Sequence, residues 1–324
     1  MIDGMINVCK EKGFTSHDVV AKLRGILKQK KIGHTGTLDP DAVGVLPVCL
    51  GKATKLCDMI ADKDKVYEAV MRLGETTDTQ DISGTVLHKT PADFTVLSKE
   101  AIEEAALSFV GDYDQLPPMY SAIKVGGKKL YELAREGKEI ERSTRSVHIF
   151  NITISDICEN KTCGTIDVTM RVHCSKGTYI RTLCHDIGEK LGTGGCMASL
   201  VRLKVGRFEL SQALTLSEIE ALAFAGDIKK HIVAVDDMLL DYPAVRVSER
   251  ANRLLYNGNP LAVSDVEIMS EQQMSGQKEK SESKASTVFS DGRWLRVYDT
   301  EGHFAAVYAY SEQKKLLKTV KMFL

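Results

Sequence analysis

The alternation of apolar and polar positions is clearest between Thr165 and Leu191. Its first half predicts a half-buried strand, because every second residue is apolar: Ile166, Val168, Met170, Val172 and Cys174. After a turn at 175–178, apolar residues recur at helical spacing up to Leu191, and Gly192 ends the helix. This strand-turn-helix unit places Tyr179 and Arg181 at or near a helix N-terminus, where anions are favoured.

The rest of the first 240 residues also mixes the two periodicities. Strands are predicted at Met5–Val8, Val43–Leu50 and Val66–Leu73. A helix is predicted after Thr15, which forms a capping-box pattern with Asp18, another near Lys52, and a third over Ser98–Val110. Residues 33–40 and 74–84 are predicted as loops and 111–118 as a break. The basic segment 120–145 is predicted to extend away from the core.

A change in composition near residues 241–243 predicts a domain boundary. Beyond it the apolar runs are short and strand-like, at Ala244–Val247, Trp294–Tyr298 and Phe304–Tyr310. A run of Gln, Ser, Lys and Glu at 271–286 predicts a mobile loop. We therefore expect a small β-rich second domain over residues 241–324, after a first domain over 1–240.

Charge is close to balanced overall but not locally. The 324 residues carry a formal net charge of -1, which argues against a strongly basic nucleic-acid-binding protein. Two stretches are nevertheless rich in Lys and Arg, namely 22–31, which holds no acidic residue, and 124–145. Such runs are commonly just the solvated face of a helix, so they do not by themselves predict RNA binding.

The eight cysteines predict reduced thiols rather than disulfides or a metal site. They include no C-x-x-C pair, and no signal-peptide pattern opens the chain, so we expect a cytoplasmic location. The pairs His173-Cys174 and Cys184-His185 lack the spacing of zinc ligands. No apolar stretch has the length of a membrane span, and we expect no membrane association.

One loop carries candidate chemistry. In residues 33–41 two glycines permit a tight turn, and Pro40 favours an extended Asp39. A carboxylate on a stiff loop suits catalysis, but Asp-Pro is also ordinary turn chemistry, and the local sequence alone favours a turn. A calcium loop opening at Asp39 and Asp41 is excluded, because Val43 occupies the next ligand position. A glycosidase pair is disfavoured, because carboxylates two residues apart on an extended loop point apart.

Several blocks, in one order, resemble the bacterial tRNA pseudouridine synthase B (TruB) family over roughly residues 5–210. They are Gly33–Pro40 continuing through Gly44–Lys55, Tyr67, Arg72–Gly74 with Thr77–Thr79, Pro117–Ala122, Lys124 with Lys128–Tyr131, Ser175–Thr182, and Leu200–Leu203. Tyr256–Pro260 and the strands after it resemble the PUA-like module that follows this core. The chain departs from the family at Glu11, where the family usually has proline, and in the 271–286 insertion.

The resemblance implies an α+β fold: a core with a mainly antiparallel mixed sheet over 1–240, an RNA-binding insertion at about 112–150, and a PUA-like β domain over 241–324. It implies that Asp39 is the catalytic carboxylate and that Arg181 orients it and keeps it ionised. It also implies that Tyr67 stacks on the uracil and assists deprotonation at C5. The residues expected to contact RNA are His34, which fills the position of the extruded base, Tyr179 and Leu200, which wall the base pocket, and Lys10, Lys124, Lys128 and Lys129, which contact phosphates.

The implied function is conversion of the T-loop uridine of tRNA, position 55, to pseudouridine without a guide RNA or cofactor and with the base extruded. Asp39 can serve as nucleophile or as a base on the ribose, and the sequence does not choose between these routes. The tRNA T stem-loop is the expected partner, with no protein partner and a monomer by default. Two alternatives remain: a guide-dependent synthase acting on ribosomal RNA, and a non-catalytic RNA-binding or folding factor.

Overall fold

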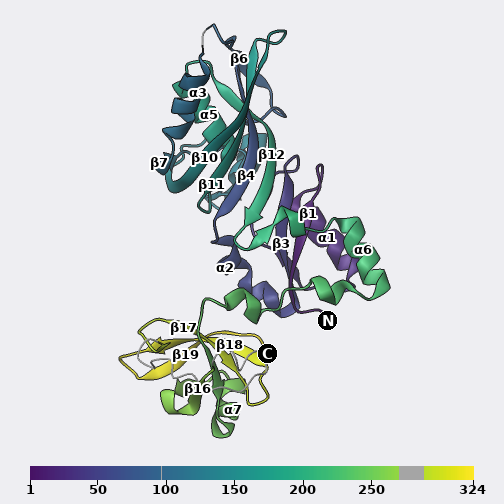
Figure 1. Ribbon diagram of the computed structural model, residues 1–324, viewed down its shortest axis with the longest axis vertical. Helices are drawn as coiled ribbons and strands as arrows, with labels where there is room; N and C mark the ends of the chain where they lie inside the picture. The colour runs from purple at the N-terminus through teal and green to yellow at the C-terminus, as the bar shows by residue number, and fades with distance from the viewer. Residues whose placement is uncertain (96, 270–287) are drawn as a thin grey trace.

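A long mixed sheet organises the N-terminal part of the chain (Figure 1). The structure is a computed structural model and describes residues 1–95, 97–269 and 288–324. The strand order is β1-β3-β12-β4-β11-β10-β7, with β2 on β3 and β13 on β12. Only the β12–β3 pair among these is parallel, which confirms the predicted mainly antiparallel mixed sheet. The sheet strands are β1 Gly4–Lys10, β2 Ile32–His34, β3 Val43–Leu50, β4 Lys65–Leu73, β7 Gly111–Gln115, β10 Arg145–Asn160, β11 Thr165–Cys174, β12 Gly195–Val205 and β13 Phe208–Glu209.

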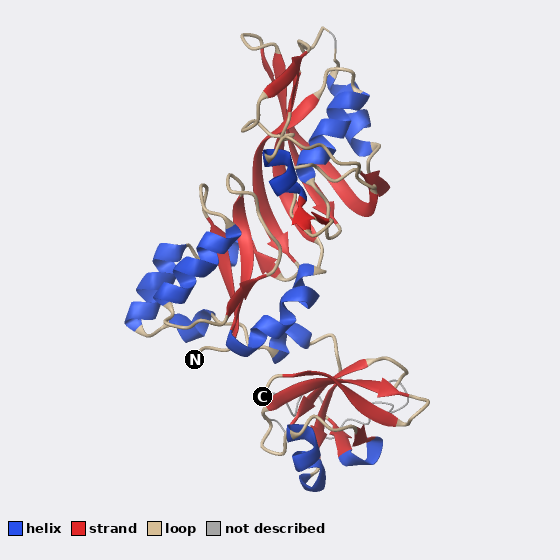
Figure 2. Cartoon of the chain, turned by 180° about the vertical axis from the view of Figure 1, so that it is seen from behind, coloured by secondary structure: helices blue, strands red, loops and turns tan. Residues whose placement is uncertain are grey.

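Helices pack against the sheet in two groups (Figure 2). The helices α3 (Lys99–Leu107) and α5 (Ile180–Lys190) bury apolar faces on β4, β10 and β11. The helices α1 (Ser16–Ile26) and α6 (Leu216–Ala225) cover β1 and β3. On the other side of β1 and β3 lie a 3-10 turn, η1 (Gly51–Leu56), and α2 (Cys57–Ala61).

Smaller elements occupy the connections. Two short hairpins are formed by β5 (Glu75–Thr77) with β6 (Val86–Lys89), and by β8 (Lys124–Val125) with β9 (Lys128–Lys129). Helix α4 (Leu130–Arg135) follows the second hairpin. One short 3-10 turn, η2 (Leu210–Gln212), precedes α6, and two others, η3 (Ile228–His231) and η4 (Asp236–Leu239), follow it.

A second sheet forms the C-terminal part, as the sequence predicts. Its order is β15-β19-β18-β17-β14-β16, from strands β14 Ala244–Val247, β15 Leu261–Ala262, β16 Val266–Ile268, β17 Trp294–Tyr298, β18 Phe304–Ser311 and β19 Leu316–Met322. Helix α7 (Glu249–Tyr256) and the turn η5 (Val263–Asp265) complete it. Phe323 and Val307 join the apolar cluster of Cys49 and Leu56, and Lys321 Nζ donates to the Lys55 carbonyl at 2.6 Å, so this part docks on η1.

The predicted elements are confirmed where apolar residues follow a single periodicity, either helical or alternating. Thr15 caps α1 with a capping box to Asp18, and Ser98 caps α3. The prediction of a break at 111–118 is wrong over Gly111–Gln115, which forms β7 at the edge of the sheet. Strand β10 was not predicted from its sequence, because two register shifts interrupt its alternation. Helix α6 was missed although Thr215 and Glu218 form a capping box. The predicted loop at 271–286 lies outside the described residues.

Candidate active site

The Asp39 loop joins β2 to β3 and is held by main-chain and side-chain hydrogen bonds. Gly36 has a φ of 89°, which favours glycine and lets the chain reverse after β2. The Leu38 amide donates to Ser16 Oγ at 2.9 Å, and the Gly13 amide donates to the Pro40 carbonyl at 3.0 Å. The Asp39 carboxylate is therefore presented on a loop that is fixed on both sides, with its side chain 39% exposed.

Arg181 connects Asp39 to two other segments. Its Nε lies 3.0 Å from Asp39 Oδ2, its Nη1 donates to the Thr79 carbonyl at 2.9 Å, and its Nη2 donates to the Tyr120 carbonyl at 2.9 Å. The residue is 5% exposed, in the first turn of α5 as the sequence predicts. A guanidinium has five donors in a rigid fork, so this one group can fix three chain segments at once.

The ionisation of Asp39 is set by opposing effects. Burial raises the pKa of Asp39, Arg181 lowers it, the nearby Asp81 carboxylate raises it, and Lys10 lowers it. Asp81 Oδ2 lies 3.7 Å from Arg181 Nη1, so the two carboxylates share one guanidinium. The balance leaves the pKa of Asp39 above its ordinary value, and Arg181 is the main group that favours the ionised form.

Tyr67 and Leu200 lie on adjacent strands beside this loop. Each is 8% exposed, and both belong to the apolar cluster that includes Leu38 and Ala42 on either side of Asp39. Burial is the main effect that raises the pKa of Tyr67, so its hydroxyl stays protonated near neutrality. The predicted catalytic residues Asp39, Tyr67 and Arg181 and the predicted pocket residue Leu200 are thus brought together from four separate segments.

Tyr179 and His34 border the same region. Tyr179 is the N-cap residue of α5, and Gln115 holds its backbone at both the amide (2.7 Å) and the carbonyl (2.9 Å). His34 ends β2 and makes an edge contact with His17, with ring centroids 5.8 Å apart. Burial and His17 lower the pKa of His34, which favours a neutral imidazole.

Lys10 has a different environment from the one expected. It is 0% exposed, and its Nζ donates to the carbonyls of Glu11, Phe14 and Pro40 at 3.1, 2.7 and 2.9 Å. Burial lowers the pKa of Lys10 to about 8. An ammonium enclosed in this way is not free to contact a phosphate, and we assign it instead to the support of the Asp39 loop.

Replacement of this ammonium gives a stability prediction. In Lys10→Met the carbonyls of Glu11, Phe14 and Pro40 lose the hydrogen bonds that the buried ammonium donates to them, so we expect the free energy of unfolding to fall by about 1–3 kcal/mol. Urea denaturation measures this loss. Lys12→Met is the matched control, because Lys12 is exposed, and we expect a change within about 0.5 kcal/mol. Equal stabilities of Lys10→Met and Lys12→Met would contradict the assignment.

The other predicted phosphate contacts lie on the β8–β9 hairpin. Lys124 and Lys128 are exposed, and Lys129 is half-buried with its Nζ over the Tyr131 ring at 5.3 Å. Lys128 is already paired with Glu136 at 2.9 Å. The hairpin follows Tyr120, whose carbonyl accepts from Arg181, so the basic segment begins directly at the site.

Three residues of the site were not singled out from the sequence. Asp81 and Thr79 lie in the predicted polar loop. Gln80, between them, has a φ of 62°, and its side-chain oxygen accepts a hydrogen bond from the Thr182 hydroxyl. Arg202 lies on β12 beneath the Asp39 loop and is 1% exposed. An acidic and hydroxyl-rich loop gives no signal for Asp81, but an arginine two residues after Leu200 in an apolar strand was a usable signal.

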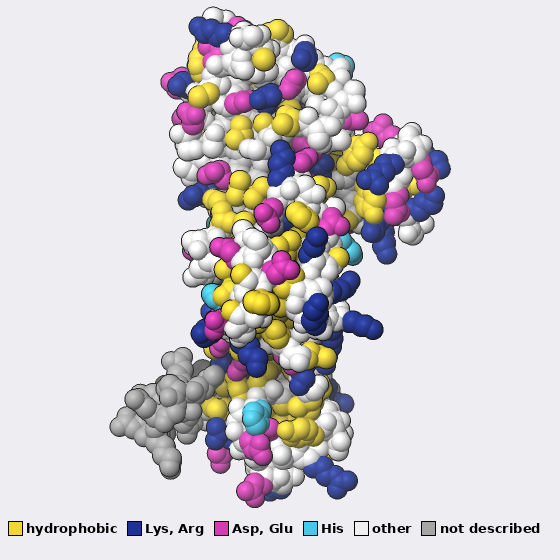
Figure 3. Space-filling view, turned by 90° about the vertical axis from the view of Figure 1, so that its right-hand side faces the viewer, with side chains coloured by type: hydrophobic (Ala, Val, Ile, Leu, Met, Phe, Trp, Pro, Cys, Tyr) yellow, Lys and Arg dark blue, Asp and Glu magenta, His cyan; other side chains and the backbone are white. Residues whose placement is uncertain are grey.

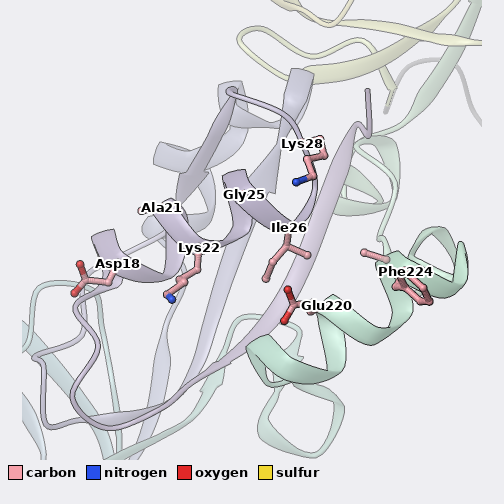
Figure 4. Close-up of a pocket in the computed structure, with 9 residues that line it drawn as sticks. Asp18, Ala21, Lys22, Gly25, Ile26, Lys28, Glu220 and Phe224 are labelled. Carbon is pink, nitrogen blue, oxygen red and sulfur yellow. The ribbon is translucent and has the colours of Figure 1, made fainter.

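An open hollow lies elsewhere, between α1 and α6. It has a volume of about 830 Å³ and is lined by residues of both helices and by Lys28 after α1, among them Lys22, Glu220 and the 96% exposed Phe224 (Figure 4). On this side of the molecule Lys and Arg side chains gather at the height of α1 and α6 (Figure 3). Since none of the predicted catalytic residues lines this hollow, we place the active site at Asp39.

In residues 1–95, 97–269 and 288–324, no group of three or more His, Cys, Asp and Glu side chains is arranged to hold a metal ion. No helix in those ranges is long and apolar enough to cross a membrane.

Comparison with known proteins agrees with this geometry. Residues 24–180 match the family described as "TruB family pseudouridylate synthase (N terminal domain)", and residues 181–242 match "tRNA pseudouridylate synthase B C-terminal domain". A protein of Lachnoclostridium phytofermentans named tRNA pseudouridine synthase B is 50% identical over 325 residues, covering 100% of both chains. The chain belongs to the TruB family of pseudouridylate synthases.

Further relatives extend the comparison. A TruB-family protein of Clostridium acetobutylicum, also named tRNA pseudouridine synthase B, is 42% identical and covers 96% of this chain and 97% of its own. Among solved structures, one titled as a Cbf5-Nop10-Gar1 complex has a TM-score of 0.69 at 25% identity, over 99% of this chain and 85% of that chain. The predicted fold class, an α+β pseudouridine synthase core with a β-rich C-terminal domain, is confirmed.

Proposed function

We propose that this enzyme, a tRNA pseudouridine synthase, isomerises the T-loop uridine at tRNA position 55, acting alone and without a guide RNA. The observation that carries the proposal is the ion pair of Asp39 with Arg181 at 3.0 Å beside Tyr67, in a chain of the TruB family. Relatives 39–50% identical bear the name tRNA pseudouridine synthase B, which favours tRNA as substrate.

The reaction breaks the bond from ribose C1′ to N1 of uracil, turns the base, and joins C1′ to C5, whose proton is lost to solvent while N1 takes up a proton. Both routes through it, a nucleophile on the ribose or a base on the ribose, need an ionised carboxylate. The Arg181 guanidinium supports that state of Asp39 by lowering the pKa that burial raises. We assign stacking on the uracil to the Tyr67 ring, and its position on β4 beside the loop supports this role.

A base stacked within an RNA loop must be extruded to reach such a recessed site. His34, at the end of β2 and with a pKa lowered by burial, supplies a neutral ring to fill the vacated position. Tyr179 and Leu200 wall the pocket, and Lys124, Lys128 and Lys129 on the hairpin contact phosphates. We assign residues 1–240 to the catalytic domain, with the RNA-binding insertion at about 112–150, and 241–324 to a PUA-like RNA-binding domain. The enzyme acts as a cytoplasmic monomer.

The second candidate, which the sequence leaves open, is a guide-dependent synthase. The test is tritium release from a tRNA transcript labelled at uracil C5, with purified enzyme and no other RNA or protein. We expect release of a single label per tRNA. Release that requires an added guide RNA would replace the proposal with the second candidate, and tRNA binding without release under either condition would favour a non-catalytic RNA-binding factor.

A further inference from the structure

Arg202 lies at the centre of the sheet, between the two strands that carry the proposed chemistry. In the register of β12 it faces Gly44 of β3 on one side and Tyr67 of β4 on the other. Gly44 has a φ of 112°, and a Cβ there would lie 2.3 Å from the Arg202 carbonyl oxygen. The backbone of Arg202 is therefore fixed closely against the strand that follows the Asp39 loop.

The side chain of Arg202 binds the chain on both sides of Asp39. Its Nε donates to the Val45 carbonyl at 2.7 Å, its Nη2 to the Gly36 carbonyl at 3.3 Å, and its Nη1 to the Thr37 carbonyl at 3.5 Å. Gly36 and Thr37 precede Asp39, and Val45 follows it on β3. One guanidinium thus sets the distance between the two ends of the loop that presents the carboxylate.

The same guanidinium reaches the hydroxyl of Tyr67. Its charge and its hydrogen bond lower the pKa of Tyr67, against the burial that raises it. In the ladder between β12 and β4, Arg202 is also the direct cross-strand partner of Tyr67, so the two side chains lie on the same face of the sheet. Arg202 therefore links Tyr67, its neighbour on β4, to the chain segments that present Asp39.

The burial of Arg202 is not explained by a gain in stability. Arg202 is 1% exposed, and in the described part of the chain its donors go to carbonyl oxygens and the Tyr67 hydroxyl rather than to a carboxylate. Burying a charge without an ionic partner carries a desolvation cost that an apolar side chain of similar volume avoids. A role in aligning the site accounts for a guanidinium at this position.

We propose that Arg202 is a positioning residue that holds the Asp39 loop and Tyr67 in fixed alignment, acting through both and contacting neither the uracil nor the ribose. The inference rests on the proposed function, because it assigns the chemistry to Asp39 and Tyr67. It adds a contact between them that the pairing of Asp39 with Arg181 does not supply. Misalignment of reacting groups by about 1 Å can cost about a hundredfold in rate.

The test is a double-mutant cycle in single-turnover tritium release, with saturating enzyme and C5-labelled tRNA. The variants are Arg202→Met, Arg202→Lys, Tyr67→Phe and Arg202→Met with Tyr67→Phe, each checked for its melting temperature and its tRNA affinity. Arg72→Met is the matched control, because Arg72 is also a cross-strand arginine on this sheet but pairs with Asp167 at 2.8 Å, away from Asp39. If Arg202→Met is unfolded, Arg202→Lys takes its place in the cycle.

We expect Arg202→Met to release tritium about a hundredfold more slowly, with tRNA affinity within about threefold of the wild type. Its effect should be smaller in the Tyr67→Phe background, and Arg202→Lys should recover part of the rate. A wild-type rate in Arg202→Met or, if that variant is unfolded, in Arg202→Lys overturns the inference, as do effects that add independently of Tyr67 or a loss of rate that follows weaker tRNA binding. Failure of the proposed function is separate, since the wild-type enzyme would then release no tritium.

Discussion

Asp39→Asn abolishes tritium release from tRNA labelled at uracil C5. The amide keeps the size of the side chain and can still accept from Arg181, but it can neither act as a nucleophile of comparable strength nor take a proton from the ribose. Loss of a carboxylate with such a role lowers the rate by about 10²–10⁴-fold or more. Single-turnover tritium release measures this directly, and tRNA binding by the variant shows that the fold and the RNA-binding surface remain intact.

Asp41→Asn is the matched control for this experiment. Asp41 lies two residues further along the same loop and is exposed, whereas Asp39 is within 3.0 Å of Arg181. We expect the rate of Asp41→Asn to be within about threefold of the wild-type rate. Equal losses in the two variants would show that the loop needs its negative charge in general, and normal turnover in Asp39→Asn would remove Asp39 from the mechanism.

Arg181→Lys has the second largest expected effect. A lysine ammonium cannot reproduce the planar fork that serves Asp39 Oδ2, the Thr79 carbonyl and the Tyr120 carbonyl together. The Asp39 loop, the 77–84 loop and the start of the basic segment then lose their common anchor. We expect single-turnover release to fall by about a hundredfold, with a small change in tRNA affinity.

Substitution of Arg181 also gives a pH prediction. Asp39 acts in its ionised form, and Arg181 lowers the pKa of Asp39 against burial and Asp81, which raise it. Arg181→Met removes the group that favours ionisation, so the pKa of Asp39 rises and a proton is retained to higher pH. The acidic limb of the rate profile therefore moves to higher pH. The measurement is the pH dependence of single-turnover release.

Arg171→Met serves as the control for both Arg181 variants, because Arg171 is an exposed arginine on β11. Its rate and its acidic limb should match those of the wild-type enzyme. An acidic limb that stays in place in Arg181→Met, or moves to lower pH, would contradict the electrostatic role assigned to Arg181.

The fold could be predicted from the sequence where a single period governs an element. Val168, Met170 and Val172 alternate on β11 and are all fully buried, and Thr15 with Asp18 marks the start of α1. The pairing of strands could not be read in this way, because β12 lies between β3 and β4 through contacts far apart in the chain. Strand β10 was hidden by its bulges, since each register shift reverses the faces on which apolar residues lie.

For the site, too, the sequence indicated some residues and not the contacts that the fold gives them. Family motifs indicated Asp39, Tyr67 and Arg181, and the structure brings them together, although the local sequence around Asp39 reads as an ordinary turn. The resemblance led us to expect that Lys10 contacts a phosphate, but its Nζ is enclosed by three carbonyls. Asp81 could be recognised only from the contacts that the fold gives it, whereas Arg202, two residues after Leu200 in an apolar strand, had a usable signal in the sequence.

The most direct test of the central claim is to locate the modified nucleotide. An unmodified tRNA transcript, incubated with the purified enzyme alone, is derivatised with a reagent that forms a stable adduct with pseudouridine and is then mapped by primer extension. The account predicts one stop that reports position 55 in the T loop, and no stop with Asp39→Asn. A stop at another position, or none with the wild-type enzyme, would contradict it.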